Sequence, residues 1–207
     1  MSEPVMGVGF CRPLASRKVA VLATALSLLG VVALSTAAQA ATEAAEPAVF
    51  AIESPRAEKG LMIDVVHAGK RLVAVGDRGH ILYSDDQGAT WVQAKVPTRQ
   101  LLTAVFFIDE QHGWAVGHDA KILASTDAGA TWTEQFKDLS REAPLLDVLF
   151  NDPNHGFAVG AYGALIETTD AGKTWTDVSD RLDNEDQYHL NAIAQVKDAG
   201  LFIVGEQ

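Results

Sequence analysis

The sequence predicts an all-β protein, a β-propeller built of four-stranded antiparallel blades. An octet with the pattern Ser/Thr-x-Asp-x-Gly-x-Thr-Trp occurs three times, and its aspartates lie 41 and then 43 positions apart. A Val-Gly pair keeps the same rhythm, since Gly76, Gly117, Gly160 and Gly205 are 41, 43 and 45 positions apart. The intervening segments are short, apolar and bounded by turn residues, which is typical of strands. Four strands in about 40 to 45 residues is the arithmetic of a propeller blade.

The first 40 residues have the three parts of a secretory signal peptide. Arg12, Arg17 and Lys18 precede an apolar run over 19–34, which is followed by the small-residue sequence Ala38-Gln39-Ala40. An uncleaved membrane anchor is the alternative, but the run is shorter than the roughly 20 residues that a membrane span needs. We therefore expect residues 1–40 to be removed and the protein to be exported to the periplasm, or to the thylakoid lumen if the host is photosynthetic.

Charge and cysteine content exclude several classes of function. The 207-residue chain has 16 basic and 27 acidic residues, and removal of the leader makes it more acidic still. Such a chain has no electrostatic surface for nucleic acid. The single cysteine, Cys11, lies in the leader, so the mature protein has no disulfide, no thiolate metal ligand and no thiol nucleophile.

The strands are expected in a fixed order within each unit. Residues 41–60 are interpreted as an N-terminal tether, in which 49–52 could add one strand. The propeller units are 61–98, 99–142, 143–187 and a truncated 188–207. First strands are expected over 62–66, 101–108, 145–150 and 190–196; second strands over 72–76, 114–117, 157–160 and 201–205; third strands over 80–83, 121–124 and 164–167; fourth strands begin at the octet tryptophan. We expect about three and a half of seven blades, as a fragment of a chain of about 330 to 350 residues.

The octet is predicted to close the hairpin between the third and fourth strands. Its Ser or Thr and its Asp can bond the backbone of the turn, its Gly can take a positive φ, and its Trp supplies a large apolar surface. The residues with this structural role are Ser84, Asp86, Gly88, Thr90, Trp91, Ser125, Asp127, Gly129, Thr131, Trp132, Thr168, Asp170, Gly172, Thr174 and Trp175. A catalytic or calcium-binding role for the three aspartates is disfavoured, because a residue repeated in every blade cannot converge on one site.

These octets resemble the Asp-boxes of BNR repeats, which are found in sialidases and other propellers. The wider phrase of Asp…His-Gly-Trp-Ala-Val-Gly followed by Ile-Leu-x-Ser-x-Asp-x-Gly-x-Thr-Trp resembles the photosystem II stability and assembly factor family over residues 60 to 207. The resemblance implies a seven-bladed propeller without enzymatic activity or cofactor. It also implies a scaffold role, with a protein partner in a membrane complex at its periplasmic or lumenal face.

Propeller geometry separates the octets from the residues expected to bind a partner. The turns between strands three and four share a face with those between strands one and two, whereas the two-to-three turns and the crossings between blades lie opposite. On that opposite face the candidate partner-binding residues are Arg78, Arg99, His118, Lys121, Arg141, Tyr162 and Arg181. The alternative is that these side chains are ordinary solvated charge, and the acidic stretch 183–186 departs from a basic binding surface.

A sialidase-like glycoside hydrolase or a carbohydrate-binding propeller is the alternative function. Sialidases use a tyrosine nucleophile, but Tyr83, Tyr162 and Tyr188 lack a matching glutamate pattern, and the sialidase Arg-Ile-Pro signature is absent. The six histidines show no H-x-x-H or H-E-x-x-H spacing, so no metal site is expected.

Overall fold

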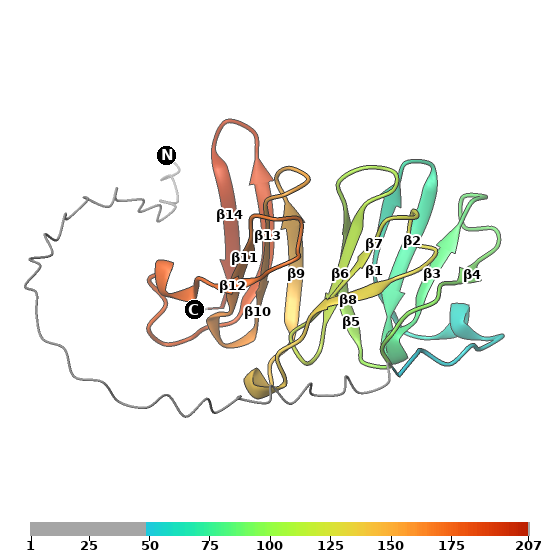
Figure 1. Ribbon diagram of the computed structural model, residues 1–207, viewed down its shortest axis with the longest axis horizontal. Coiled ribbons are helices and arrows are strands. Elements are labelled where there is room, and N and C mark those ends of the chain that lie inside the picture. The colour runs from blue at the N-terminus through green and yellow to red at the C-terminus, as the bar shows by residue number, and fades with distance from the viewer. Residues whose placement is uncertain (1–48, 207) are drawn as a thin grey trace, which may run out of the picture. The chain divides into compact units, whose positions relative to one another are not determined.

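Three four-stranded antiparallel sheets and one two-stranded sheet follow one another along the chain in the computed structural model of the protein (Figure 1). The structure describes residues 49–206, so the predicted leader and the first part of the tether lie outside the described residues. Each sheet has its strands in sequence order. Across residues 49–206 every helix is a 3-10 turn of three residues, and none has the length and apolarity to cross a membrane.

We number the sheets one to four along the chain. Sheet one consists of β1 (Met62–Ala68), β2 (Arg71–Gly76), β3 (Ile81–Ser84) and β4 (Val92–Gln93), and sheet two of β5 (Leu102–Phe107), β6 (Gly113–Gly117), β7 (Lys121–Ser125) and β8 (Thr133–Phe136). Sheet three consists of β9 (Leu145–Phe150), β10 (Gly156–Gly160), β11 (Leu165–Thr168) and β12 (Thr176–Asp177), and sheet four of β13 (Leu190–Val196) and β14 (Gly200–Gly205). The 3-10 turns are η1 (Ala57–Lys59), η2 (Asp77–Gly79), η3 (Leu139–Arg141), η4 (Ala161–Gly163) and η5 (Ser179–Arg181).

The predicted all-β class and its four-stranded antiparallel sheets are confirmed. The first three strands of units one to three and the two strands of unit four lie where the repeat placed them, while β4 and β12 are only two residues long. The strand that the sequence allowed over 49–52 does not form. The segment is instead joined to the residues after β4 by one backbone hydrogen bond, from Ala51 N to Val96 O at 2.9 Å.

The recurring Val-Gly pair has a steric cause. Each of these glycines ends a second strand beside a register shift in the first strand. A Cβ on Gly117 would lie 2.2 Å from the carbonyl oxygen of Leu101, and a Cβ on Gly76 would lie 2.0 Å from that of Leu61. Only glycine lets the two backbones approach this closely at a bulge.

Apolar side chains pack between neighbouring sheets rather than within one sheet. One cluster joins sheets one and two and includes Val73, Leu102 and Trp132, all nearly inaccessible to solvent. A second cluster joins sheets two and three, and Trp175 packs against it. Each of these octet tryptophans therefore fills the space toward the preceding sheet, which is how a blade repeat builds its core.

The outer side of sheet one exposes apolar side chains whose counterparts in sheet two are buried against sheet one. Val65 on β1 is 55% exposed, whereas Val105 at the equivalent position of β5 is 4% exposed because it packs against sheet one. Ile63, two residues before Val65 on the same strand, is exposed as well. This side of sheet one therefore carries the same apolar pattern that sheet two buries.

Polar side chains on the first strands also link neighbouring sheets. Asp64 accepts a hydrogen bond from Val105 N at 2.9 Å, and Asp147 accepts one from Ile193 N at 2.9 Å. Between these links, the hydroxyl of Thr103 donates to Leu145 O at 2.6 Å. Burial raises the pKa of Asp147, although two backbone N–H groups partly offset this effect.

Candidate functional site on the face opposite the Asp-boxes

The three Asp-boxes form the same internal hydrogen-bond network. In the first, the hydroxyl of Ser84 donates to Asp86 Oδ1 at 2.8 Å and accepts from Gly88 N at 2.8 Å. Thr90 donates from its backbone N–H to Asp86 Oδ1 at 2.8 Å and from its hydroxyl to Oδ2 at 2.6 Å. The other two boxes repeat these bonds within 0.1 Å. Both carboxylate oxygens are thus already used to hold the turn.

These bonds stabilise the ionised form of each box aspartate. The Thr90 hydroxyl and backbone N–H lower the pKa of Asp86 to about 2. The pKa of Asp170 is lowered by Thr174 in the same way. Burial raises the pKa of Asp127, but the hydrogen bonds from Thr131 and Ser125 outweigh it, so that the pKa is lowered overall.

Contacts between turns place the Asp-boxes with the one-to-two turns. Ala128 N in the second box donates to Gln111 O at 3.1 Å in the turn between β5 and β6, and Ala171 N donates to Asn154 O at 2.9 Å in the next sheet. Arg71, at the start of β2, reaches the second box from the preceding sheet through Ala128 O at 3.2 Å. In residues 49–206 no three His, Cys, Asp or Glu side chains gather as metal ligands.

The opposite face includes the two-to-three turns, in which a left-handed backbone conformation directs side chains toward solvent. Arg78 and Tyr162 occupy equivalent positions in η2 and η4, each with φ of 55° and each followed by a glycine with positive φ. The side chain of Arg78 is 80% exposed, and Tyr162 packs edge-on against His189. His118 in the corresponding turn of sheet two is also exposed.

Arg99 lies where the N-terminal segment, residues 49–56, meets the first crossing. Its Nε donates to Phe50 O at 2.9 Å. It lines a cavity of about 460 Å³ with Lys121 and Lys137, and a second of about 320 Å³ with Arg78 and the buried His80. The structure therefore brings Arg78 and Arg99 together at one site.

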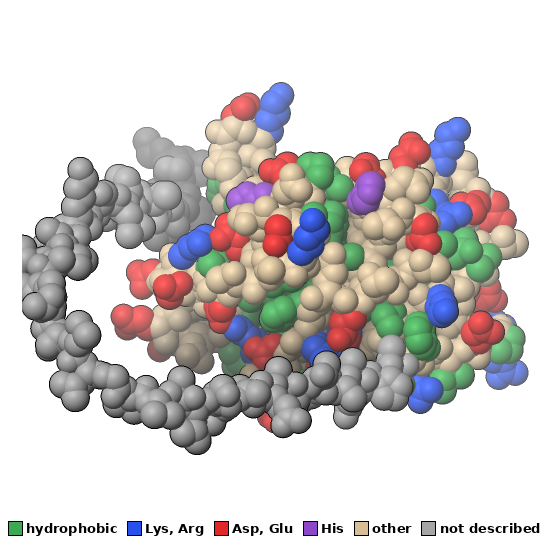
Figure 2. All heavy atoms as spheres, in the orientation of Figure 1, with side chains coloured by type: hydrophobic (Ala, Val, Ile, Leu, Met, Phe, Trp, Pro, Cys, Tyr) green, Lys and Arg blue, Asp and Glu red, His purple; other side chains and the backbone are tan. Residues whose placement is uncertain are grey.

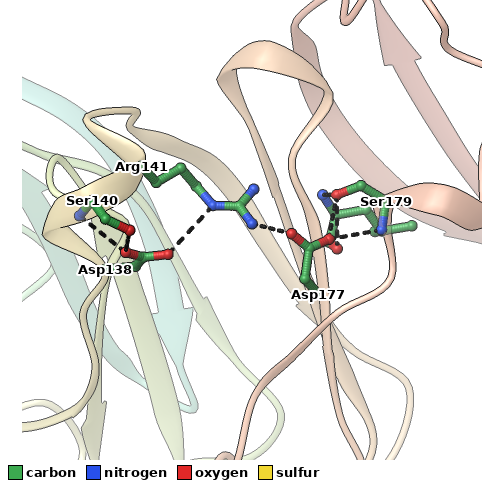
Figure 3. Close-up of polar contacts among 6 residues, drawn as sticks. Asp138, Ser140, Arg141, Asp177 and Ser179 are labelled. Atoms are coloured by element: carbon green, nitrogen blue, oxygen red, sulfur yellow. Dashed lines mark hydrogen bonds and ion pairs between the residues drawn. The ribbon is translucent and has the colours of Figure 1, made fainter.

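The other predicted cations are held in ion pairs. Lys121 is buried and bonds Glu134. Figure 3 shows Arg141 pointing from η3 between Asp138 on its own crossing and Asp177 at the end of β12.

Arg181 is paired as well, with Glu167 on β11 at 2.8 Å. Burial raises the pKa of Glu167, but hydrogen bonds from His155 and Arg181 lower it overall. Each of these three cations therefore has a structural partner. Lys121 still shares the larger cavity with Arg99, whereas Arg141 and Arg181 line neither cavity.

The partner-binding residues chosen from the sequence did not include His80, Lys137 or the N-terminal segment. The repeat contained a signal for His80, because His80, Lys121 and Ala164 follow a two-to-three turn at the same repeat position. In the structure all three residues are buried. The Phe50 contact carried no signal, since residue 50 lies outside the repeat units.

The charge of this face changes along the chain. Residues 180–186 add four acidic side chains to the crossing between sheets three and four. In the view of Figure 2, acidic side chains lie at the left, where Figure 1 shows sheets three and four. The basic end of the face is at sheets one and two, where Arg99, Lys121 and Lys137 line one cavity and Arg78 lines the other.

Comparison with known proteins identifies the repeat. The family model described as Photosynthesis system II assembly factor YCF48 matches residues 85–144 and 135–207, which together are more than half of the chain. The comparison with curated proteins found no match.

Solved structures of propellers share the fold. YCF48 from Cyanidioschyzon merolae is 18% identical with a TM-score of 0.57, over 72% of this chain and 49% of that chain. YCF48 bound to D1 peptide is 21% identical with a TM-score of 0.50, over 56% of this chain and 39% of that chain. An ancestral GH74 enzyme is 13% identical with a TM-score of 0.58, over 70% of this chain and 22% of that chain. The chain thus spans less than half the length of these proteins.

The likeness to these structures supports the predicted propeller fold, and the family match accounts for the Asp-boxes and for the His-Gly-Trp-Ala-Val-Gly phrase together. The chain belongs to the YCF48 family of photosystem II assembly factors.

Proposed function

We propose that the protein is an exported, non-enzymatic propeller that holds a polypeptide segment of a membrane complex on the face opposite its Asp-boxes. The observation that carries this proposal is that the polar side chains of the Asp-box face bond one another, whereas cations on the opposite face are exposed. The box aspartates use both carboxylate oxygens internally, whereas Arg78 stands exposed beside Arg99 on the other face.

Family membership supports a protein partner. A YCF48 has been solved with a D1 peptide, so a D1 peptide is the first ligand to test here. The basic end at sheets one and two suits an acidic or carboxylate-bearing segment, and the acidic crossing at 180–186 suits a basic one, so the proposed partner has both charges.

The test is fluorescence polarisation with labelled D1 peptides and with peptides from other exported membrane-protein segments. Arg78→Glu should weaken binding at least about tenfold, because reversal of an exposed charge removes one attraction and adds a repulsion. Lys173→Glu on the Asp-box face is the matched control and should bind as the unaltered protein does. Equal loss in both variants, with unchanged thermal stability, would refute the proposed binding face.

Hydrolase activity is the alternative that a direct assay separates. Hydrolysis of fluorogenic sialosides or β-glucan oligosaccharides by the purified protein, abolished by one carboxylate substitution on the candidate face, would overturn the non-enzymatic proposal. Glycan-array binding would favour a carbohydrate-binding propeller instead.

A further inference from the structure

A cavity of about 320 Å³ lies between the N-terminal segment and sheet one. It is lined by Ile52, Glu53, Ser54, Pro55, Arg78, His80 and Arg99. Its wall is formed by two parts of the chain that are distant in sequence, namely residues 52–55 and the loops at the ends of β2 and β4.

The N-terminal segment is fixed in place by Gln93 in β4 and by residues that follow this strand. The side chain of Gln93 bonds the segment twice, donating to Ile52 O at 3.0 Å and accepting from Ser54 N at 3.0 Å. Ala51 N donates to Val96 O at 2.9 Å, and Arg99 Nε donates to Phe50 O at 2.9 Å. This wall of the cavity is therefore held in place by hydrogen bonds that join the backbone of the segment to β4 and to the residues after it.

His80 is the unusual member of the lining. Its side chain lies in a residue that is only 6% exposed, and its buried Nδ1 has no hydrogen-bond partner among residues 49–206. Buried side-chain nitrogens are nearly always paired in native proteins, so the unpaired Nδ1 sets His80 apart from the rest of the lining.

The charged groups of the lining define that ligand. Arg78 has one loose ion pair, with Asp77 at 3.6 Å, and the terminal Nη atoms of Arg99 have no partner in the described part of the chain. Guanidinium groups bind carboxylates with paired hydrogen bonds, and an imidazole nitrogen adds a further one. Glu53 is the single carboxylate in the lining, and it makes no ion pair within residues 49–206.

We propose that this cavity binds the carboxylate-bearing residue of a peptide, with Arg78, Arg99 and His80 around the carboxylate and Ile52 and Pro55 against its apolar part. The proposal rests on the proposed function for the nature of the ligand, since a peptide is the partner expected on this face. The carboxylate can come from a C-terminus or from an acidic side chain.

The test follows the imidazole resonances of the protein by NMR at fixed pH, with the His80 signal assigned through His80→Gln. Three probes are titrated: acetyl-Ala-Ala-Leu with a free carboxylate, the same tripeptide as its amide, and acetyl-Ala-Glu-Ala amide. The carboxylate probes should shift the His80 resonance saturably, and the amide of the first should bind at least about tenfold more weakly. Preference between the first and third probes distinguishes a C-terminus from a side chain.

Two variants change the lining in opposite directions. Arg78→Gln should weaken binding of the free-carboxylate probe about tenfold. Glu53→Gln should strengthen it several-fold, because it removes the one like charge from the lining. Lys173→Gln, remote from the cavity, should change neither.

The outcomes separate this inference from the proposed function. If the acid and the amide bind equally, or if no probe saturates the His80 shift, the carboxylate site is wrong, whereas D1-peptide binding on this face can still stand. If the His80 shift saturates and no longer peptide binds, the site stands and the proposed partner function falls.

Discussion

The guanidinium of Arg141, in the crossing between sheets two and three, forms an ion pair with the carboxylate of Asp177 at the end of β12 (Figure 3). Ser179 donates its backbone N–H and its hydroxyl to the other oxygen of Asp177, at 2.9 and 2.6 Å. A cation that sequence spacing assigned to partner binding thus joins one crossing to the next sheet.

Arg141→Glu should destabilise the protein by about 1 to 2 kcal/mol, because it places a third carboxylate beside Asp138 and Asp177. Urea unfolding measures this, and a double-mutant cycle with Asp177→Ala isolates the pair. Arg78→Glu is the comparison, since Arg78 is mostly exposed and should leave stability nearly unchanged. A stability loss at Arg78 equal to that at Arg141 would contradict the separation of structural from exposed cations.

Asp127→Ala should cost about 2 kcal/mol, because it removes the acceptors of Ser125 and Thr131 in a partly buried turn. Thermal or urea unfolding checks this value. Asp183→Ala is the control, since Asp183 is exposed and accepts no hydrogen bond among the described residues. The Asp127 substitution should not change peptide binding at temperatures where the protein remains folded.

Stability should fall steeply in acid. The pKa of Asp86 is lowered to about 2, and those of Asp127 and Asp170 are lowered as well. A carboxyl with a folded-state pKa below its unfolded value of about 3.9 stabilises the fold above that value, and this contribution is lost as the pH falls through the folded-state pKa. Urea midpoints measured between pH 6 and 2 should therefore decline mainly below pH ~4, and Asp86→Asn should decline less.

Asp147 should act in the opposite direction. Its pKa is raised by burial, so its contribution is fully present below the unfolded value and is lost as the pH rises through the folded-state pKa. Asp147→Asn removes this opposing contribution, so its urea midpoint should decline more steeply in acid than that of the unaltered protein, and an unchanged decline would contradict the assignment.

Trp132, which is buried, and Trp175, which is partly buried, differ in the bonding of their indole N–H groups. The indole N–H of Trp132 donates to Gly129 O at 2.9 Å, whereas that of Trp175 is buried without a partner among residues 49–206. Trp132→Phe should cost about 1 kcal/mol more than Trp175→Phe, because only the first loses a hydrogen bond. Unfolding followed by circular dichroism measures both, and the reverse order would contradict the assigned bonding.

The fold was largely predictable because its determinants are local and repeated. The octets and the Val-Gly pairs encode turns and a close backbone approach in a few adjacent residues, so the strands could be placed from the repeat alone. The candidate site was not, because it depends on contacts between units. Arg141 meets Asp177 across 36 positions, and Arg99 meets Phe50 across 49. No periodic pattern records such pairs.

Positive φ values show the same limit on a smaller scale. The glycine of the octet predicted a left-handed backbone conformation. The residues just before it, Gln87, Ala128 and Ala171, also adopt positive φ. Their side chains show no preference for that conformation, and the hydrogen bonds of the box impose it.

The position shared by His80, Lys121 and Ala164 bears on how such a protein can diversify. An aromatic base, a long cation and a methyl group occupy the same buried point of three successive units, with the strand pairing around them retained. A lineage can therefore exchange the chemical character of one cavity by a single codon change without disturbing the architecture.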